Sequence, residues 1–198
     1  MARLERGGAV LTGGAARGAR LLTVPGRDIR PALARLRTSV FEVLRPRLEG
    51  ATVLDLFAGI GTMGIEALSR GAEYAVFIDM DPRCVEAVRR NLAKLRFADR
   101  AEVLLGDALE APTLAAPLAR RFDVIFVDPP YALYDDPASS ARLEKAVAGL
   151  KGWGDAVVEH RSMQARPETW AGGSLADQRK YGGTTVTWYA GPGSPRHG

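Results

Sequence analysis

Short apolar runs alternate with amphipathic stretches along most of the chain. From residue 52 onward, five runs are typical of strands buried on both faces: TVLDLF, YAVFID, AEVLLGD, FDVIFVD and DAVVEH. The stretches between them predict helices over residues 62–70, 83–97, 138–149 and part of 108–119. Strands that alternate with helices need right-handed crossovers, which build a mostly parallel sheet with helices on both faces. The pattern therefore predicts an α/β protein with a doubly wound, Rossmann-like sheet.

Both ends of the chain depart from this alternation. Near the front, four apolar residues at helical spacing predict a first helix that stops at Pro46: Leu36, Val40, Phe41 and Leu44. Near the end, glycines bound two short strands, which predict a closing antiparallel hairpin and bring the sheet to seven strands. We therefore expect a basic extension with the first helix over 1–49, one main domain over 50–190 and a disordered tail over 191–198.

Composition narrows the class of protein. The chain has 198 residues, of which 46% are apolar, enough for one sizeable core. No run approaches the roughly 18 apolar residues of a membrane span, and the first residues lack the apolar core of a signal peptide, so we expect a cytoplasmic protein without membrane contact. One cysteine, Cys84, and two histidines are too few for a typical zinc site, so no metal is expected. We also expect a monomer.

Positive charge is concentrated at the front of the chain. Residues 1–49 carry 10 arginines and 4 acids, a net charge of +6, whereas residues 50–198 carry 17 basic and 19 acidic residues, a net charge of −2. Guanidinium groups suit phosphate oxygens, so this segment suits contacts with a nucleic acid, although a solvated or disordered arm explains it equally well. The candidate RNA-binding residues are Arg17, Arg20, Arg30, Arg35 and Arg37.

The turn after the first core strand carries a candidate ligand-binding loop with the spacing G-x-G-x-x-G. Glycines there let the backbone approach a ligand at the carboxyl end of the strand, although a tight turn needs glycine without a ligand too. Asp55 lies inside the strand, and a buried carboxylate needs a partner, such as the ammonium group of a ligand. The candidate cofactor-binding residues of this loop are Asp55, Phe57, Ala58, Gly59, Gly61 and Gly64.

Acidic residues also follow the next two strands. Asp79 comes roughly 20 residues after the glycine loop, where an acid can accept both ribose hydroxyls of an adenosine. Asp81 precedes Pro82 and is equally typical of a helix N-cap. Asp107, after the third strand, can accept from an adenine amino group or cap a helix. We assign Asp79, Met80, Asp107 and Ala108 to the cofactor site.

The motif Asp128-Pro129-Pro130-Tyr131 ends the fourth strand and carries the candidate catalytic residues. Two successive prolines favour an extended, stiff turn that presents carbonyl oxygens. Asp128 and the Pro129 carbonyl can accept two hydrogen bonds from an amino group, which directs its nitrogen lone pair towards an electrophilic methyl group. Tyr131 can stack on a base that has left its helix. A simple rigid turn is the alternative interpretation.

Taken together, the strand-ending motifs resemble those of class I S-adenosylmethionine-dependent amino-methyltransferases: DLFAGIGTMGIEALSRG, FIDMDP, GDA and DPPY. Over roughly residues 12–190 the chain is similar to the RsmD family. The resemblance implies a methyltransferase domain over 50–190, S-adenosyl-L-methionine as cofactor, and methylation of the N2 amino group of a guanine in 16S rRNA, either naked or in the assembled 30S subunit.

The resemblance extends to both ends of the chain. Arg20, Arg30-Pro31 and Arg35-Leu36-Arg37 resemble the basic entrance of the family, and Lys180-Tyr181-Gly182 resembles its closing hairpin. The front departs from the family pattern at Ala32, Ala34 and Thr38, so the contacts of this segment do not follow from the family.

Several other functions fit parts of the pattern. The same DPPY loop occurs in DNA amino-methyltransferases, and it can hold the amide of a protein glutamine. A non-catalytic RNA-binding module would leave the DPPY loop without a task. A nicotinamide oxidoreductase would explain the glycine turn but would leave the DPPY loop unexplained.

Overall fold

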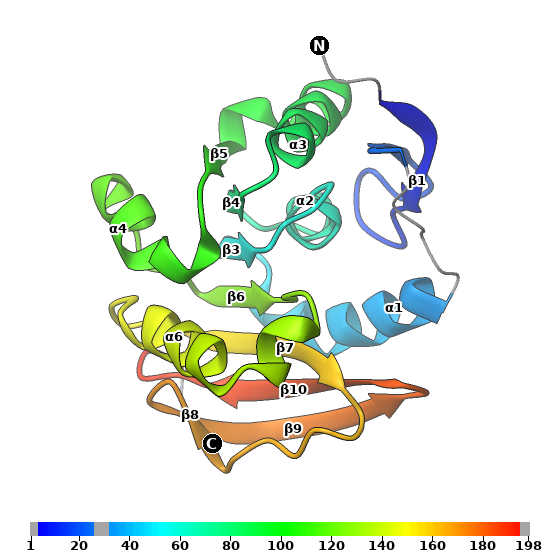
Figure 1. Cartoon of the computed structure of the whole chain (residues 1–198). Coiled ribbons are helices and arrows are strands. Elements are labelled where there is room, and N and C mark those ends of the chain that lie inside the picture. Colours follow the sequence, from blue (N-terminus) through cyan, green and yellow to red (C-terminus); the bar gives the residue numbers. More distant parts are fainter. Residues whose placement is uncertain (1–3, 26–31, 195–198) are drawn as a thin grey trace.

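The computed structural model describes residues 4–25 and 32–194, which form two sheets. The main sheet has eight strands in the order β5-β4-β3-β6-β7-β10-β9-β8 (Figure 1). Its parallel strands are β3 (Thr52–Leu56), β4 (Tyr74–Asp79), β5 (Ala101–Leu105), β6 (Val124–Val127) and β7 (Asp155–Arg161). Its antiparallel strands are β8 (Thr169–Trp170), β9 (Gly173–Tyr181) and β10 (Thr184–Ala190).

Helices cover both faces of this sheet. One face carries α1 (Ala32–Leu44), α2 (Thr62–Ser69) and α3 (Pro82–Leu95). The other carries α4 (Ala111–Ala115), α5 (Ala132–Asp135) and α6 (Pro137–Ala148). Short 3-10 turns occupy Arg45–Arg47, Ala98–Arg100, Ala108–Glu110 and Ala116–Leu118. The doubly wound α/β fold expected from the sequence is thus confirmed, with β8 as an eighth strand at the edge.

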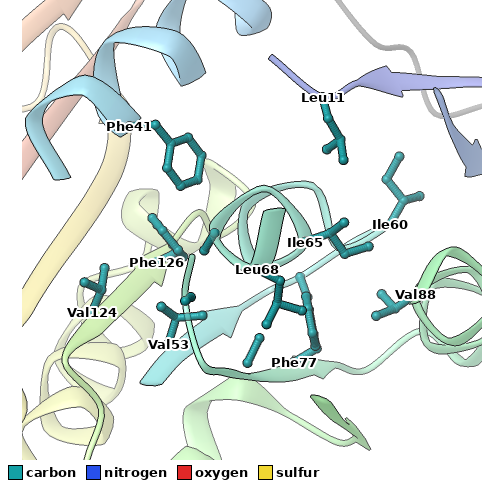
Figure 2. Packing of buried hydrophobic residues seen from close by; sticks show 14 of the residues in the cluster. Leu11, Phe41, Val53, Ile60, Ile65, Leu68, Phe77, Val88, Val124 and Phe126 are labelled. Carbon is teal, nitrogen blue, oxygen red and sulfur yellow. The ribbon is translucent and has the colours of Figure 1, made fainter. Parts of the chain in front are cut away.

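The core between the sheet and α1, α2 and α3 positions the glycine loop. Phe41 of α1 packs against Phe126 of β6 with ring centroids 5.7 Å apart, and Ile65 and Leu68 of α2 fill the space beside Phe77 (Figure 2). At Gly64 an added Cβ would lie 2.3 Å from the Phe77 ring, so only glycine lets α2 lie this close to β4.

The front of the chain contains a hairpin that the sequence pattern did not predict. Strands β1 (Glu5–Val10) and β2 (Arg20–Thr23) pair antiparallel beside α3. The side chain of Asn91 on α3 joins three segments, because its Oδ1 accepts from the Leu22 amide at 2.7 Å and its Nδ2 donates to the carbonyls of Leu22 and Ile60, both at 3.1 Å. The front segment is therefore docked on the core and is not a merely solvated arm.

A buried carboxylate anchors the same segment to α1 and α2. Glu66 on α2 is fully buried and accepts from Arg37 Nε at 3.2 Å and from Arg70 Nη2 at 3.0 Å. It also accepts from the Thr12 amide at 3.1 Å and from the Thr12 hydroxyl. Arg37 in turn donates to the Val10 carbonyl at 2.7 Å. The ion pairs and hydrogen bonds of Glu66 thus tie the β1–β2 connection to two helices.

The tail expected to be disordered is in part hydrogen-bonded to the domain. The amides of Gly191 and Gly193 donate to the carbonyls of Gly154 and Trp153 at 2.6 and 2.8 Å. Ser194 Oγ donates to Asp155 at 2.8 Å. The expectation was therefore wrong for residues 191–194, because the glycines allow the chain to lie directly against residues 152–154, just before β7, and residues 195–198 lie outside the described part of the chain.

The Gly64 contact makes a test of the fold. Replacing Gly64 with alanine should lower the free energy of unfolding by about 1–3 kcal/mol, because the added methyl forces α2 away from Phe77. Urea denaturation followed by circular dichroism measures the change. Gly7→Ala is the matched control, since a Cβ there meets nothing within 4 Å. Equal unfolding midpoints for the two variants would contradict this account of the packing.

Candidate active site

A cavity of about 920 Å³ opens at the carboxyl ends of the parallel strands, within the size range of ligand sites. Every strand-ending motif singled out in the sequence contributes to its lining. The expected site residues that line it are Asp55, Phe57, Ala58, Gly59, Asp79, Met80, Asp107, Ala108, Asp128, Pro129, Pro130 and Tyr131. Motifs as far apart as residues 55 and 131 therefore meet in one cavity.

Strand alternation brings acidic side chains to one side of the sheet. Val53, Phe77, Phe126 and Val157 all face the core that α1, α2 and α3 cover. An acid follows each of them two residues later: Asp55, Asp79, Asp128 and Glu159. Because side chains two residues apart in a strand share a face, these acids turn to the same face at the sheet edge.

Asp79 is held by the backbone of the glycine loop. Its Oδ2 accepts from the Gly59 amide at 2.7 Å and its Oδ1 accepts from the Asp81 amide at 2.8 Å. Gly59 has φ 57° and Phe57 has φ 61°, so the loop turns sharply beneath the carboxylate. Each carboxylate oxygen keeps a lone pair after these bonds, so Asp79 can still accept from two hydroxyl groups.

Asp55 of β3 also lines the cavity, although its side chain is buried and the residue is only 3% exposed. Its Oδ2 accepts from the Gly64 amide at 2.9 Å. Burial raises the pKa of Asp55 well above its ordinary value, the charges of Asp128 and Asp79 raise it further, and the bond from Gly64 opposes the shift. A cationic ligand in the cavity would stabilise the ionised carboxylate.

Two glycines of the loop act on its shape and do not line the cavity. Gly61 has φ 82° and precedes the first residue of α2, and a Cβ there would lie 3.0 Å from Ile65 and 3.2 Å from Val88. Gly64 faces Phe77, as described above. The helix start and the helix–strand contact require these glycines, so both have a structural role, and their assignment to the cofactor site stays a prediction.

Asp107 and Asp81 both cap helical turns. Asp107 Oδ1 accepts from the Leu109 amide at 2.9 Å, and Asp81 accepts from the Arg83 amide at 2.9 Å. Both residues still line the cavity. Capping and ligand contact are thus compatible for Asp107, whose second oxygen lies 3.8 Å from Arg142.

The DPPY turn follows β6, the strand next to β3, so it borders the cavity beside the glycine loop. Asp128 faces the cavity and is exposed to solvent there, yet protein surrounds it closely enough that desolvation raises the pKa of its carboxyl to about 6. Tyr131 is held at both ends: its hydroxyl lies 2.8 Å from Thr184 Oγ1, and the Arg161 guanidinium lies 5.3 Å from its ring centroid. These contacts fix the Tyr131 side chain where the DPPY turn lines the cavity.

Both ends of the chain complete the cavity, which local sequence patterns did not predict. The front contributes Ala9, Thr23, Leu36 and Arg37, and the β9–β10 turn contributes Tyr181, Gly182, Gly183 and Thr184. Glu159 of β7 lines it as well. Tyr181 donates to the Ser39 hydroxyl, which joins the turn to α1. Only the similarity of Lys180-Tyr181-Gly182 to the family hairpin could have drawn attention to this turn.

The expected RNA-binding arginines differ in their exposure to solvent. Arg17, Arg20 and Arg35 are exposed, whereas Arg30 lies outside the described residues. Arg37 is only 5% exposed and is paired with Glu66, so its assignment as an RNA contact is corrected to a structural one. Burial inside an ion pair leaves its guanidinium committed to the protein.

The cavity lining carries far more negative than positive charge. Arg37 is the one arginine or lysine among its lining residues, all of which belong to the described chain, and it is already paired. The acids are Asp55, Asp79, Asp81, Asp107, Asp128 and Glu159. Such a lining attracts a cationic ligand and repels an anionic one. No group of histidines, cysteines and acids arranged to hold a metal ion occurs within residues 4–25 and 32–194, nor does a helix long and apolar enough to cross a membrane.

Comparison with known proteins points to methyltransferases. Residues 10–190 match the family described as conserved hypothetical protein 95. The chain is 35% identical over 176 residues to YlbH of Bacillus subtilis, described as a candidate rRNA methyltransferase, an alignment that covers 89% of this chain and 95% of that protein. It is 36% identical over 121 residues to ribosomal RNA small subunit methyltransferase D of Escherichia coli, covering 61% of this chain and 59% of that protein.

A solved structure agrees with this relationship. The Escherichia coli protein yhhF, described as a candidate methyltransferase, superposes with a TM-score of 0.77 at 29% identity, covering 95% of this chain and 100% of that one. The family match spans the glycine loop, Asp79 and the DPPY turn, so every motif of the cavity falls inside it. The chain therefore belongs to the family of conserved hypothetical protein 95, the RsmD family of methyltransferases.

Proposed function

We propose that this protein uses S-adenosyl-L-methionine to methylate the N2 amino group of a guanine in 16S rRNA of the small ribosomal subunit. The observation that carries the proposal is the acidic cavity that the DPPY turn, the glycine loop and Asp79 line together. The relatives named for small-subunit rRNA methylation support the substrate. Such a substrate agrees with the expected cytoplasmic location, and a monomer remains our expectation.

The lining fits the charge of this cofactor. S-adenosylmethionine carries a cationic sulfonium and a cationic ammonium group, which the acidic residues attract. A nicotinamide dinucleotide carries an anionic pyrophosphate, which the same residues repel, so the oxidoreductase alternative is disfavoured. When bound, S-adenosylmethionine supplies an electrophilic methyl group. Asp79 would hold the ribose, Asp107 and Ala108 would border the adenine, and Asp55 would lie near the ammonium group.

The DPPY turn is suited to hold the amino group that receives the methyl. Ionised Asp128 and the Pro129 carbonyl would accept hydrogen bonds from its two N–H groups, so the nitrogen lone pair would point towards the methyl donor. Tyr131, fixed by Thr184 and Arg161, offers a ring for stacking of the extruded base. Positioning and electrostatic stabilisation would supply most of the rate enhancement. After transfer, the methylated nitrogen can lose its extra proton to solvent.

Exposed arginines lie on or beside segments that line the cavity. Arg20 belongs to β2 with Thr23, Arg35 belongs to α1 with Leu36, and Arg17 lies in the turn between β1 and β2. Their guanidinium groups suit the phosphates that flank an extruded nucleotide. We propose these three, together with Arg30, as RNA contacts.

One assay tests the whole proposal. Purified protein is incubated with methyl-labelled S-adenosylmethionine and 30S subunits that lack the modification, and the RNA is digested to nucleosides. We expect label in N2-methylguanosine. Label on duplex DNA or on a protein glutamine instead would preserve the DPPY chemistry and reject the rRNA substrate. Absence of both transfer and cofactor binding would reject the methyltransferase.

Two variants should separate cofactor binding from methyl transfer. Asp79→Ala removes the ribose acceptor and should weaken the cofactor by about 10- to 100-fold, the range for a hydrogen bond to a charged group. Asp128→Asn should lower kcat by about 100-fold or more and change the cofactor dissociation constant by less than about fivefold. Calorimetry and single-turnover kinetics give the two quantities. An unchanged cofactor affinity in Asp79→Ala would refute the site assignment.

The raised pKa of Asp128 predicts a pH dependence. Below the pKa of about 6 the carboxyl is protonated and loses acceptor capacity, so kcat/KM should fall about tenfold per pH unit as the pH drops and should level off above 6. A bound cation favours the ionised form, so the inflection in kcat should lie at lower pH than that in kcat/KM. Asp128→Asn should lack the inflection, and an identical profile in this variant would assign the titration to another group.

A further inference from the structure

Glu159 lines the cavity and has no part in the methyl transfer described above. It follows Val158 in β7, and Val158 is the register partner of Val127 in β6. Asp128 directly follows Val127, the last residue of β6, just as Glu159 follows Val158 in β7. The two acids therefore occupy neighbouring positions on adjacent parallel chain segments. Adjacent strands lie about 4.8 Å apart, which places the two acids side by side at the same edge of the sheet.

The strand fixes the position of Glu159. Its Cα pairs with Val186 of β10 on the side away from β6, so hydrogen-bonded strands lie on both sides of β7. Its backbone carbonyl accepts from the Tyr134 hydroxyl at 3.2 Å. Tyr131 and Thr184, which line the cavity beside it, are hydrogen-bonded to each other. The backbone of Glu159 is therefore fixed by β10 on one side and by the Tyr134 hydroxyl at its carbonyl.

The two acids match two neighbouring donors on one edge of guanine. The Watson–Crick edge of guanine presents the N2 amino group beside N1–H, and both are donors. Adenine and cytosine present an amino group beside a ring nitrogen that is an acceptor. A carboxylate next to the amino-binding site would accept from N1–H of guanine and would repel the lone pair of the other two bases.

We infer that Glu159 reads guanine, its carboxylate accepting N1–H while Asp128 and Pro129 hold the N2 amino group. The inference rests on the proposed function and deepens it, because the DPPY turn alone accepts any amino group. Glu159 thus supplies the discrimination between guanine and the other amino-bearing bases. Removing its charge should relax base choice more than it slows transfer from the cofactor.

The test replaces the target guanine with 2-aminopurine, which keeps the N2 amino group and has a lone pair at N1. The analogue is introduced by splinted ligation into 16S rRNA at the nucleotide that the unchanged enzyme methylates, and 30S subunits are reconstituted. The unchanged enzyme should prefer guanine by about tenfold or more, the value of one hydrogen bond to a charged group. Glu159→Gln can donate its amide N–H to N1 of the analogue, so this preference should fall at least tenfold.

Controls separate base reading from folding and from the proposed function. Glu102→Gln, at the amino end of β5, should keep the preference of the unchanged enzyme. Calorimetry should show a smaller loss of cofactor affinity in Glu159→Gln than in Asp79→Ala, because Glu159 contributes only its charge to the lining. The fluorescence of 2-aminopurine, measured without cofactor, should show tighter binding by Glu159→Gln than by the unchanged enzyme. Equal loss on both bases, or no change on either, would overturn the role of Glu159. Failure of the unchanged enzyme to methylate N2 of guanine would instead overturn the proposed function.

Discussion

The burial of Glu66 constrains how the β1–β2 hairpin, α1 and α2 are arranged. A carboxylate without exposure is tolerable only when its oxygens are fully paired, and here two arginines and a threonine pair them. Removing one partner of such a pair costs about 3–5 kcal/mol, because the other charge stays buried. The hairpin, α1 and α2 must therefore stay together, and with them the glycine loop that begins α2.

The cavity depends on a second constraint, the parity of side chains in the strands. A strand shifted by one residue would turn both its acid and its core residue to the opposite face of the sheet. The register of β3, β4, β6 and β7 is fixed by Val53, Phe77, Phe126 and Val157, which are all buried in one core. The same packing that stabilises the sheet thus places the negative charge that a cationic cofactor needs.

The sequence predicted the elements that depend on residues close together in the chain. It did not predict the contacts between residues far apart in the chain. Strands β3 to β7, the glycine loop and the DPPY turn depend on residues close in the chain, so their pattern predicted them. The role of Arg37 depended on Glu66, 29 residues away, and the β1–β2 hairpin depended on Asn91, 69 residues from Leu22. Nothing near Arg37 in the sequence distinguishes a buried arginine from one that meets phosphate. The motif correctly marked Gly64 as a position that needs glycine, but the reason, its close contact with Phe77, is visible only in the structure.

Ala9 and Thr184 line one cavity, although nearly the whole chain separates them. During translation the glycine loop, Asp79 and Asp128 leave the ribosome before the β9–β10 turn exists, so the nascent chain has an open site without Tyr181 or Thr184. Tyr131 also lacks the hydroxyl that holds it until then. The wall is completed only when the last hairpin pairs with β7. The site of an enzyme that acts on ribosomal RNA is thus completed by a hairpin that the ribosome makes after the rest of that site.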